Sequence, residues 1–306
     1  MTDGRGTQSP GSPRKAGPMS APPGVAVLRL NAFTRDGEGG NPAGVVLDAG
    51  RLIDADMLAI AADVGYSETA FVLDGPPAAD RRRYTVRYFA PQAEVPFCGH
   101  ATVALGAALG QALGPGDLVL DTAAGAVPVT TGQRSSGEWW ARLASVRPRQ
   151  QPAGQATLQQ ALDCFGWPAQ VLDPGLPPAV CYAGAWHLVL GLAERDTLER
   201  MSYDFAALRQ LSVEQGWATV SLVFRISPQE HLARNPFPLG GVVEDPATGA
   251  AAAAYGGYLR ALGILQPPAR FRIEQGAQIG RPCELLVELP AGLSSVWVTG
   301  AVTSID

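Results

Sequence analysis

Two short segments of the sequence place reactive side chains directly ahead of predicted helices. They read EVPFCGHA over residues 94–101 and EDPATGAA over residues 244–251. His100 lies in the first and Asp245 in the second, and both side chains can carry a proton during catalysis. Because helix N-termini present unpaired backbone N–H groups and a partial positive charge, each segment also predicts a binding site for an anion.

The two segments match each other at an offset of 150 residues. The residues Glu94, Pro96, Gly99, Ala101, Ala104, Gly106 and Leu109 recur as Glu244, Pro246, Gly249, Ala251, Ala254, Gly256 and Leu259. Two unrelated helices rich in small residues could also give such a match. We favour a duplicated domain, because the spacing of the Glu, Pro and Gly residues is repeated along with the Ala-rich composition. Two helix starts facing each other would hold a small carboxylate-bearing substrate.

A third candidate for proton chemistry is Glu68, in the segment GYSETAFVLD before a strand-like apolar run. Each candidate also has a purely structural interpretation. Glu68 could be a surface carboxylate, His100 a structural histidine, and Asp245 a helix-capping carboxylate. We favour a functional interpretation because the two matched helix starts carry His100 and Asp245 together.

Composition excludes several classes of function. At 306 residues the chain is long enough for two domains, and its net charge of −5 and pI near 5.3 argue against binding to nucleic acid or an anionic membrane. The only lysine is Lys15, in a Gly/Pro/Ser-rich leader over residues 1–22 that we expect to be disordered and that lacks the apolar core of a signal peptide. Chemistry through a lysine Schiff base is therefore excluded.

The four cysteines are widely scattered along the sequence and the three histidines are far from one another, and this spacing predicts neither a metal site nor a disulfide framework. They are Cys98, Cys164, Cys181, Cys283, His100, His187 and His231. No apolar stretch is long enough to span a bilayer. We therefore expect a cytoplasmic protein with free thiols and no cofactor.

The hydrophobic pattern predicts an α+β fold. Helices are expected at residues 54–64 (with Asp54 as N-cap and Gly65 as the stop), 98–113, 204–216 and 248–262. Strands are expected at residues 25–33, 44–48, 69–74, 84–89, 179–192, 218–226, 283–289 and 296–305. The helices at 98–113 and 248–262 are apolar on nearly every face, so we expect each at the centre of a lobe, wrapped by a sheet.

The sequence resembles the PhzF-like isomerases of phenazine biosynthesis, which have the two-lobed fold of diaminopimelate epimerase. The resemblance rests on GNPAGVVLD (40–48), SETAFV (67–72), RYFAP with CGHAT (87–102), EDPATG (244–249) and QGAQIGRP (275–282), in the family's order. It implies two pseudo-symmetric lobes, each a strongly curved, mostly antiparallel sheet around its helix. The N-terminal lobe would span residues 23–131, completed by a C-terminal strand at 294–306, and the C-terminal lobe residues 132–293.

The resemblance also implies an activity. The protein would be a cofactor-independent, metal-free isomerase, and a homodimer, acting on a small cyclic unsaturated amino or carboxylic acid of secondary metabolism such as antibiotic biosynthesis. Glu68 would be the general acid/base that moves a proton between two carbons. Gly99 and His100 would bind and orient the substrate, and Asp245 would assist proton movement or polarise a substrate group.

The remaining predicted substrate-binding residues are Asn41, Thr248, Gly249 and Ala250. The chain departs from the family at Ala250, where a serine is common, and this change predicts a more apolar pocket on that side.

Two other functions remain open at the level of sequence. One is an amino-acid racemase or epimerase that uses Cys98, although the equivalent position in the second copy is Thr248 and offers no second thiol. The other is a non-catalytic protein that binds a small molecule on the same scaffold. Retention of Glu68, His100 and Asp245 together favours an enzyme.

Overall fold

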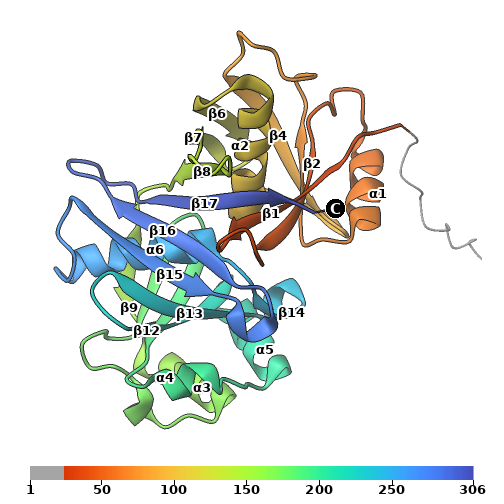
Figure 1. Ribbon diagram of the computed structural model, residues 1–306. Helices are drawn as coiled ribbons and strands as arrows, with labels where there is room; N and C mark the ends of the chain where they lie inside the picture. The colour runs from red at the N-terminus through yellow and green to blue at the C-terminus, as the bar shows by residue number, and fades with distance from the viewer. Residues whose placement is uncertain (1–23, 306) are drawn as a thin grey trace, which may run out of the picture.

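The computed structural model describes residues 24–305, and the predicted leader over residues 1–22 lies outside them. The chain forms two lobes, one above the other in Figure 1, and a long helix lies at the heart of each lobe. Strands surround both helices and belong to one continuous, curved, mostly antiparallel sheet. The prediction of an α+β fold with two lobes is confirmed.

The described part of the N-terminal half, from residue 24 onward, contains eight strands and two helices. They are β1 (Leu28–Thr34), β2 (Asn41–Val46), α1 (Asp54–Val64), β3 (Thr69–Val72), β4 (Arg83–Ala90), β5 (Ala93–Val95), α2 (Gly99–Leu113), β6 (Gly116–Thr122), β7 (Gly125–Gln133) and β8 (Trp139–Ala144). Antiparallel pairing dominates, and β2–β3 and β4–β6 are the parallel pairs of this half.

The C-terminal half begins with β9 (Arg149–Pro152), α3 (Gln155–Phe165), η1 (Ala169–Val171), β10 (Ala179–Tyr182), β11 (Trp186–Gly191), α4 (Arg195–Glu199) and α5 (Phe205–Gln215). It continues with β12 (Thr219–Arg225), β13 (Glu230–Phe237), η2 (Pro238–Gly240), β14 (Val242–Asp245), α6 (Gly249–Ala261), β15 (Ala269–Gln275), η3 (Ala277–Ile279), β16 (Cys283–Leu289) and β17 (Trp297–Ser304).

Strand pairing repeats between the halves. The parallel pair β4–β6 flanks α2, and the parallel pair β13–β15 flanks α6. A short strand precedes each helix, with β5 antiparallel to β4 and β14 antiparallel to β13. The parallel pairs β2–β3 and β11–β12 likewise enclose helical connections. This repetition supports the duplication inferred from the 150-residue offset.

Each central helix is buried because its side chains are small. The buried residues of α2 run without a break from His100 to Gly110, and those of α6 from Ala251 to Leu259. Gly106 and its equivalent Gly256 let the sheet approach closely. A β-carbon would lie 2.8 Å from Val129 at Gly106 and 3.0 Å from Val287 at Gly256. The matched glycines therefore set the distance between helix and sheet in both lobes.

Most predicted elements are confirmed, and three predictions were wrong in detail. The single strand expected over residues 179–192 is the hairpin β10–β11, which turns at Gly184 with φ +110°. Ile53, not Asp54, is the N-cap of α1, while Gly65 ends the helix as predicted with φ +71°. The predicted lobe boundary at residue 131 falls inside β7. The sheet around α2 continues through β8, because β8 pairs with β7 and packs on α2.

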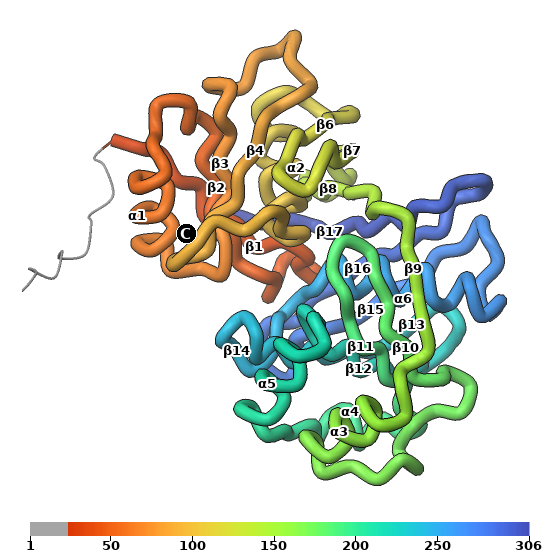
Figure 2. Tube along the Cα trace, turned by 180° about the vertical axis from the view of Figure 1, so that it is seen from behind, coloured from red at the N-terminus to blue at the C-terminus, as the bar shows by residue number. Residues whose placement is uncertain are grey.

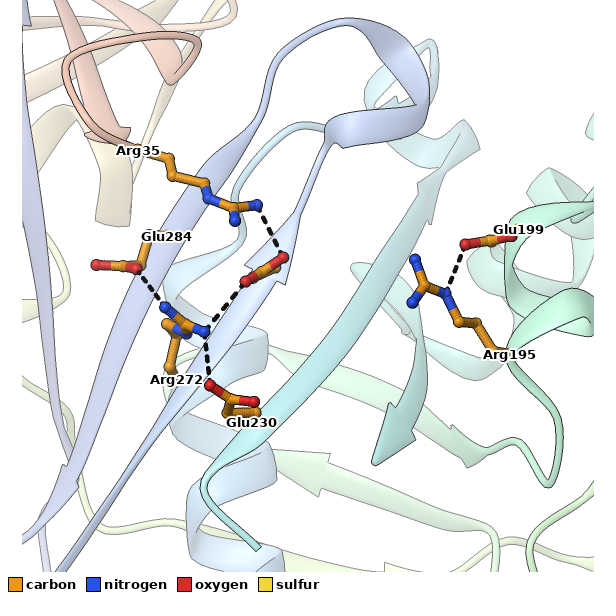
Figure 3. Close-up of polar contacts among 7 residues, drawn as sticks. Arg35, Arg195, Glu199, Glu230, Arg272 and Glu284 are labelled. Atoms are coloured by element: carbon orange, nitrogen blue, oxygen red, sulfur yellow. Dashed lines mark hydrogen bonds and ion pairs between the residues drawn. The ribbon is translucent and has the colours of Figure 1, made fainter. Parts of the chain in front are cut away.

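The C-terminal strand joins the two halves of the molecule. β17 pairs with β1 and β8 beside α2, and also with β16 of the other half. Figure 1 shows it crossing the molecule between the lobes, and Figure 2 shows the same crossing from behind. Arg35, beyond the end of β1, adds an ion pair of 2.8 Å to Glu274 on β15. This pair lies beside those from Arg272 to Glu230 and Glu284 (Figure 3).

No helix among the described residues is long and apolar enough to cross a membrane.

Candidate active site

The N-termini of α2 and α6 meet between the lobes. A β-carbon at Gly99 would lie only 3.9 Å from the backbone nitrogen of Ala250 and the Cα of Gly249. The N-cap residues Cys98 and Thr248 make no side-chain capping hydrogen bond. First-turn N–H groups of both helices are thus left for another acceptor, and two positive helix ends adjoin each other. This is the arrangement that a small carboxylate would need.

Glu68 and His100 lie together on the N-terminal side of this site. Glu68 directly precedes β3 and is anchored by its carbonyl, which accepts a hydrogen bond from Gly44. Its carboxylate Oε2 is 3.5 Å from His100 Nε2, and the Ser67 Oγ is 3.3 Å from the same nitrogen. The His100 side chain is 6% exposed and that of Glu68 is 17% exposed. A buried imidazole touching a partly exposed carboxylate can hold or pass a proton.

Cys98 completes this side of the site. Its Sγ lies 3.3 Å from His100 Nδ1. Burial raises the pKa of the Cys98 thiol well above its usual value, and the negative charges of Glu68 and Asp245 act in the same direction. The thiol is thus held in its protonated form. The opposing Thr248 hydroxyl donates to Asp245, so it offers no second thiol or free base.

Asp245 lies on the C-terminal side, at the end of β14, and each of its three oxygen atoms accepts a hydrogen bond. Its Oδ1 accepts a hydrogen bond of 2.7 Å from Asn41 Nδ2, and its Oδ2 accepts one of 2.6 Å from the Thr248 hydroxyl. Its backbone carbonyl accepts from Gln275 Nε2 at 2.7 Å. Burial raises the pKa of Asp245, while the nearby His100 and the hydrogen bonds from Thr248 and Asn41 oppose that rise.

Asn41 links the two lobes at the site. It begins β2 in the N-terminal half, and its Nδ2 donates to Asp245 and also to the Ala247 carbonyl at 3.1 Å. The structure therefore brings together all eight predicted site residues, namely Asn41, Glu68, Gly99, His100, Asp245, Thr248, Gly249 and Ala250. Ala250 contributes a backbone nitrogen only, in keeping with the missing hydroxyl.

Sequence reasoning missed a chain of buried polar side chains behind Asp245. Gln275 accepts a 3.0 Å hydrogen bond from Asn235, Asn235 accepts one of 3.0 Å from Thr219, and the Thr219 hydroxyl lies 2.8 Å from His187 Nδ1. Gln275 is the first residue of the QGAQIGRP motif, so the sequence did contain a signal for this residue. Nothing in the sequence connects Thr219, Asn235 and His187, because three different strands bring them together.

We expected His187 to be a core histidine whose polar atoms are hydrogen-bonded, and only one of its two ring nitrogens is. It is buried and its Nδ1 is paired, but its Nε2 has no partner. Burial lowers the pKa of His187 to about 3, so the ring is neutral.

Three side chains with possible metal-ligand atoms lie close together, although the spacing along the sequence did not indicate such a cluster. Glu68, Cys98 and His100 each place a ligand atom within 4.8 Å of the others. The sequence contained no sign of this cluster, because cysteines and histidines are each widely spaced along it. In the folded protein, the turn before α2 and the start of β3 lie close together and bring the three side chains into one place.

Two apposed helix starts that carry a carboxylate, an imidazole and a fixed aspartate form the candidate site of a protein with the two-lobed epimerase-like fold. The sequence profile of the phenazine biosynthesis-like family (PhzC–PhzF) matches residues 30–306, and the chain belongs to this family.

Known proteins resemble the chain along nearly its whole length. A protein of Deinococcus radiodurans described as an uncharacterized isomerase is 35% identical, covering 93% of this chain and 91% of its own. The trans-2,3-dihydro-3-hydroxyanthranilate isomerase of Pseudomonas fluorescens is 29% identical, covering 83% and 86%. The crystal structure of the Bacillus anthracis PhzF-family phenazine biosynthesis protein is 26% identical, with a TM-score of 0.77 over 92% of this chain and 97% of the other. The prediction that the chain is an isomerase is confirmed.

Proposed function

We propose that the protein moves a proton and a double bond within a small cyclic, unsaturated amino or carboxylic acid, with Glu68 as the general acid/base. The observation that carries the proposal is the position of Glu68 and His100 beside the meeting point of two uncapped helix starts. The name of the Pseudomonas fluorescens relative supports the substrate class, because a dihydroanthranilate is a cyclic diene bearing a carboxylate and an amine.

The substrate carboxylate would bind to the backbone N–H groups at the starts of α2 and α6. Removing a proton from a ring carbon conjugated with this carboxylate sends negative charge onto the carboxylate oxygens. The two helix ends stabilise that charge as it forms, which lowers the barrier. Gly99 and Gly249 have no side chains that would keep the substrate from the backbone.

Glu68 would take the proton from one ring carbon as a carboxylate and return it to another as a carboxylic acid. The double bonds shift as the proton moves, and no atom or electron is gained or lost. His100 contacts the same carboxylate and would steady or share the proton between the two steps. Asp245 has both oxygens fixed by Asn41 and Thr248, so we assign it to a polar substituent of the substrate, such as an amine or a hydroxyl.

A test is to incubate the protein with trans-2,3-dihydro-3-hydroxyanthranilate and related carboxylated cyclohexadienes in deuterated water and to follow the ring by NMR. We expect a displaced double bond, with deuterium at the newly protonated carbon in a fraction of turnovers. Inversion of the α-carbon with label would favour the racemase alternative that uses Cys98. Binding without any chemical change would favour the non-catalytic alternative.

The homodimer stays a prediction that follows from the family resemblance, and the cytoplasmic location stays a prediction that follows from the sequence pattern. The four cysteines are free thiols, which supports a reducing compartment.

A further inference from the structure

The buried polar chain behind Asp245 consists of His187, Thr219, Asn235 and Gln275. Each of these four residues is at most 3% exposed. They lie on β11, β12, β13 and β15, which pair side by side, so the chain crosses four neighbouring strands of the C-terminal lobe. Because polar groups buried this deeply need hydrogen-bond partners, the direction of each bond in the chain follows from the bond next to it.

The direction is fixed at the Asp245 end, where the first partner is a backbone carbonyl. A carbonyl only accepts, so the Gln275 atom 2.7 Å from it is the amide nitrogen Nε2. The amide oxygen of Gln275 then faces Asn235, which donates through Nδ2 at 3.0 Å. The Asn235 oxygen in turn accepts from the Thr219 hydroxyl at 3.0 Å. That hydroxyl has a single hydrogen, so His187 Nδ1, 2.8 Å away, has to donate to it.

His187 is therefore the donor at which the chain begins. Burial lowers the pKa of His187 to about 3, so the ring is neutral and carries one hydrogen, which the chain places on Nδ1. The other ring nitrogen, Nε2, is then a bare lone pair. It is also the nitrogen for which the described residues provide no partner. Every hydrogen atom of the chain thus points away from His187 and toward Asp245.

At its other end the chain reaches the carboxylate of Asp245 through Thr248. The second hydrogen of Gln275 Nε2 points at the Thr248 hydroxyl oxygen, 3.2 Å away. Because this oxygen accepts from Gln275, the hydroxyl turns its own hydrogen to Asp245 Oδ2, at 2.6 Å. Oδ1 accepts from Asn41. Hydrogen bonds donated to both oxygens favour the charged form of a buried carboxylate.

We infer that the buried polar chain points all its hydrogen bonds toward Asp245 and holds the carboxylate there as an ionised acceptor. Its members are positioning residues, which act through Thr248 and Asp245 and do not touch the substrate. Hydrogen bonds that point one way polarise one another, so the loss of one link weakens the links after it. The substrate group bound at Asp245 then has to be a hydrogen-bond donor. This last consequence rests on the proposed function, whereas the direction of the chain does not.

The first test determines which nitrogen of His187 carries the hydrogen. It uses ¹⁵N NMR of the histidine rings in the full-length protein, with the signals of His187 assigned through His187→Asn. We expect a hydrogen on Nδ1 and a bare Nε2 at neutral pH. A hydrogen on Nε2, or on both nitrogens, would overturn the direction of the chain.

The second test follows the Asp245 carboxyl by ¹³C NMR through a pH titration, with the signal assigned through Asp245→Asn. Thr219→Val keeps the shape of the side chain but removes the hydroxyl, so we expect the pKa of Asp245 to rise by about half a unit. Thr219→Ser keeps the hydroxyl and should keep the wild-type pKa. Thr299→Val is the matched control and should leave the pKa of Asp245 unchanged, because the buried Thr299 hydroxyl has no hydrogen-bond partner among the described residues.

These variants change hydrogen bonds without changing charges. The other titratable groups that act on Asp245, or are acted on by it, are Glu68, Cys98, His100 and Cys283. None of the four belongs to the buried polar chain, so all of them are kept in each variant. A change in the pKa of Asp245 then reports the hydrogen bonds that the chain supplies.

An unmoved pKa of Asp245 in Thr219→Val, or an equal rise in Thr219→Ser, would overturn the positioning role, even if Thr219→Val lowered stability. A further arm measures kcat/KM on the acid side of its pH profile. We expect a fall of about threefold in Thr219→Val and recovery in Thr219→Ser. A shifted pKa of Asp245 with unchanged kcat/KM would contradict the catalytic role proposed for Asp245 and leave the direction of the chain intact.

Discussion

The two helix starts that meet at the site come from one duplicated pattern but carry different groups. At the start of α2, the side chains of Cys98 and His100 meet Glu68 and can exchange protons. At the start of α6, Thr248 and Ala250 occupy the equivalent positions, and Asp245 has both carboxylate oxygens hydrogen-bonded. Under the proposed function, proton transfer would therefore be concentrated in the N-terminal half, and the C-terminal half would hold and polarise the substrate.

This division teaches how a symmetric scaffold can serve an asymmetric reaction. Both helix starts keep their glycine and their uncapped N–H groups, so under the proposed function each directs positive potential at the substrate carboxylate. Only one of them keeps reactive side chains. A racemase that inverts a carbon needs acid/base groups on two opposite faces, whereas an isomerase that moves a proton across one face needs only one.

On the N-terminal side, a large effect is expected for His100→Asn, second only to that of Glu68→Gln. The asparagine can keep one hydrogen bond, but it cannot share a proton with Glu68, so kcat should fall by about 10²-fold while KM changes little. Steady-state kinetics on the substrate identified by NMR measure both. A kcat within threefold of the wild-type value would show that the imidazole takes no part in proton transfer.

On the C-terminal side, Gln275→Ala should act mainly on stability. The change leaves the Asp245 carbonyl and the Asn235 amide without their partners inside the protein. Unsatisfied buried groups cost about 1–3 kcal/mol each, so the free energy of unfolding in urea should fall by about 2 kcal/mol or more, and kcat by about tenfold. Gln278→Ala, at an exposed residue of the same motif, is the control. Equal losses of stability and kcat in Gln275→Ala and Gln278→Ala would contradict the role of Gln275 in supporting Asp245.

Gly99→Ala tests whether the helix starts themselves bind the substrate. The added methyl group would point at Ala250 and Gly249, 3.9 Å away, in the space proposed for the carboxylate. Helix propensity would improve, so stability should be kept while KM rises about tenfold, equivalent to about 1.4 kcal/mol. Gly154→Ala, at the N-cap of α3, should leave KM unchanged. An unchanged KM in Gly99→Ala would place the carboxylate elsewhere.

The smallest effect concerns His187, at the far end of the polar chain behind Asp245. Burial lowers the pKa of His187 from 6.5 to about 3, so below pH 6.5 the unfolded chain binds a proton that the folded chain does not. The free energy of unfolding should thus fall as the pH drops, and this group should contribute about 1.4 kcal/mol per pH unit to the fall. His187→Asn should lessen this slope between pH 6.5 and 5, as measured by urea unfolding. If the free energy of unfolding fell equally steeply with pH in the wild-type protein and in His187→Asn, His187 would be protonated in the folded state.

Much of the fold and the site could be predicted from sequence, because local signals coincide with the elements that matter. Gly65 stops α1, and small apolar residues mark α2 and α6 as central helices. β13 was missed because its polar residues resemble a loop. Arg234 is buried against Glu244, and Asn235 bonds Gln275, contacts that exist only in the folded chain.

The cluster of Glu68, Cys98 and His100 could not be inferred either. Its geometry depends on how the start of β3 meets the start of α2, and periodicity gives no measure of that distance. The motifs identified the residues, and the fold supplied the distances between them.

The most direct test of the account is Glu68→Gln. The glutamine has nearly the shape of glutamate but cannot accept a proton, so turnover should fall by at least about 10³-fold. Folding and the affinity for the reaction product, measured by calorimetry, should stay within about threefold of wild type. Glu94→Gln, which alters an ion pair with Arg87 in the same lobe, should retain turnover. Undiminished turnover of Glu68→Gln with the substrate that the wild-type protein isomerises would contradict the assignment of Glu68 as the acid/base.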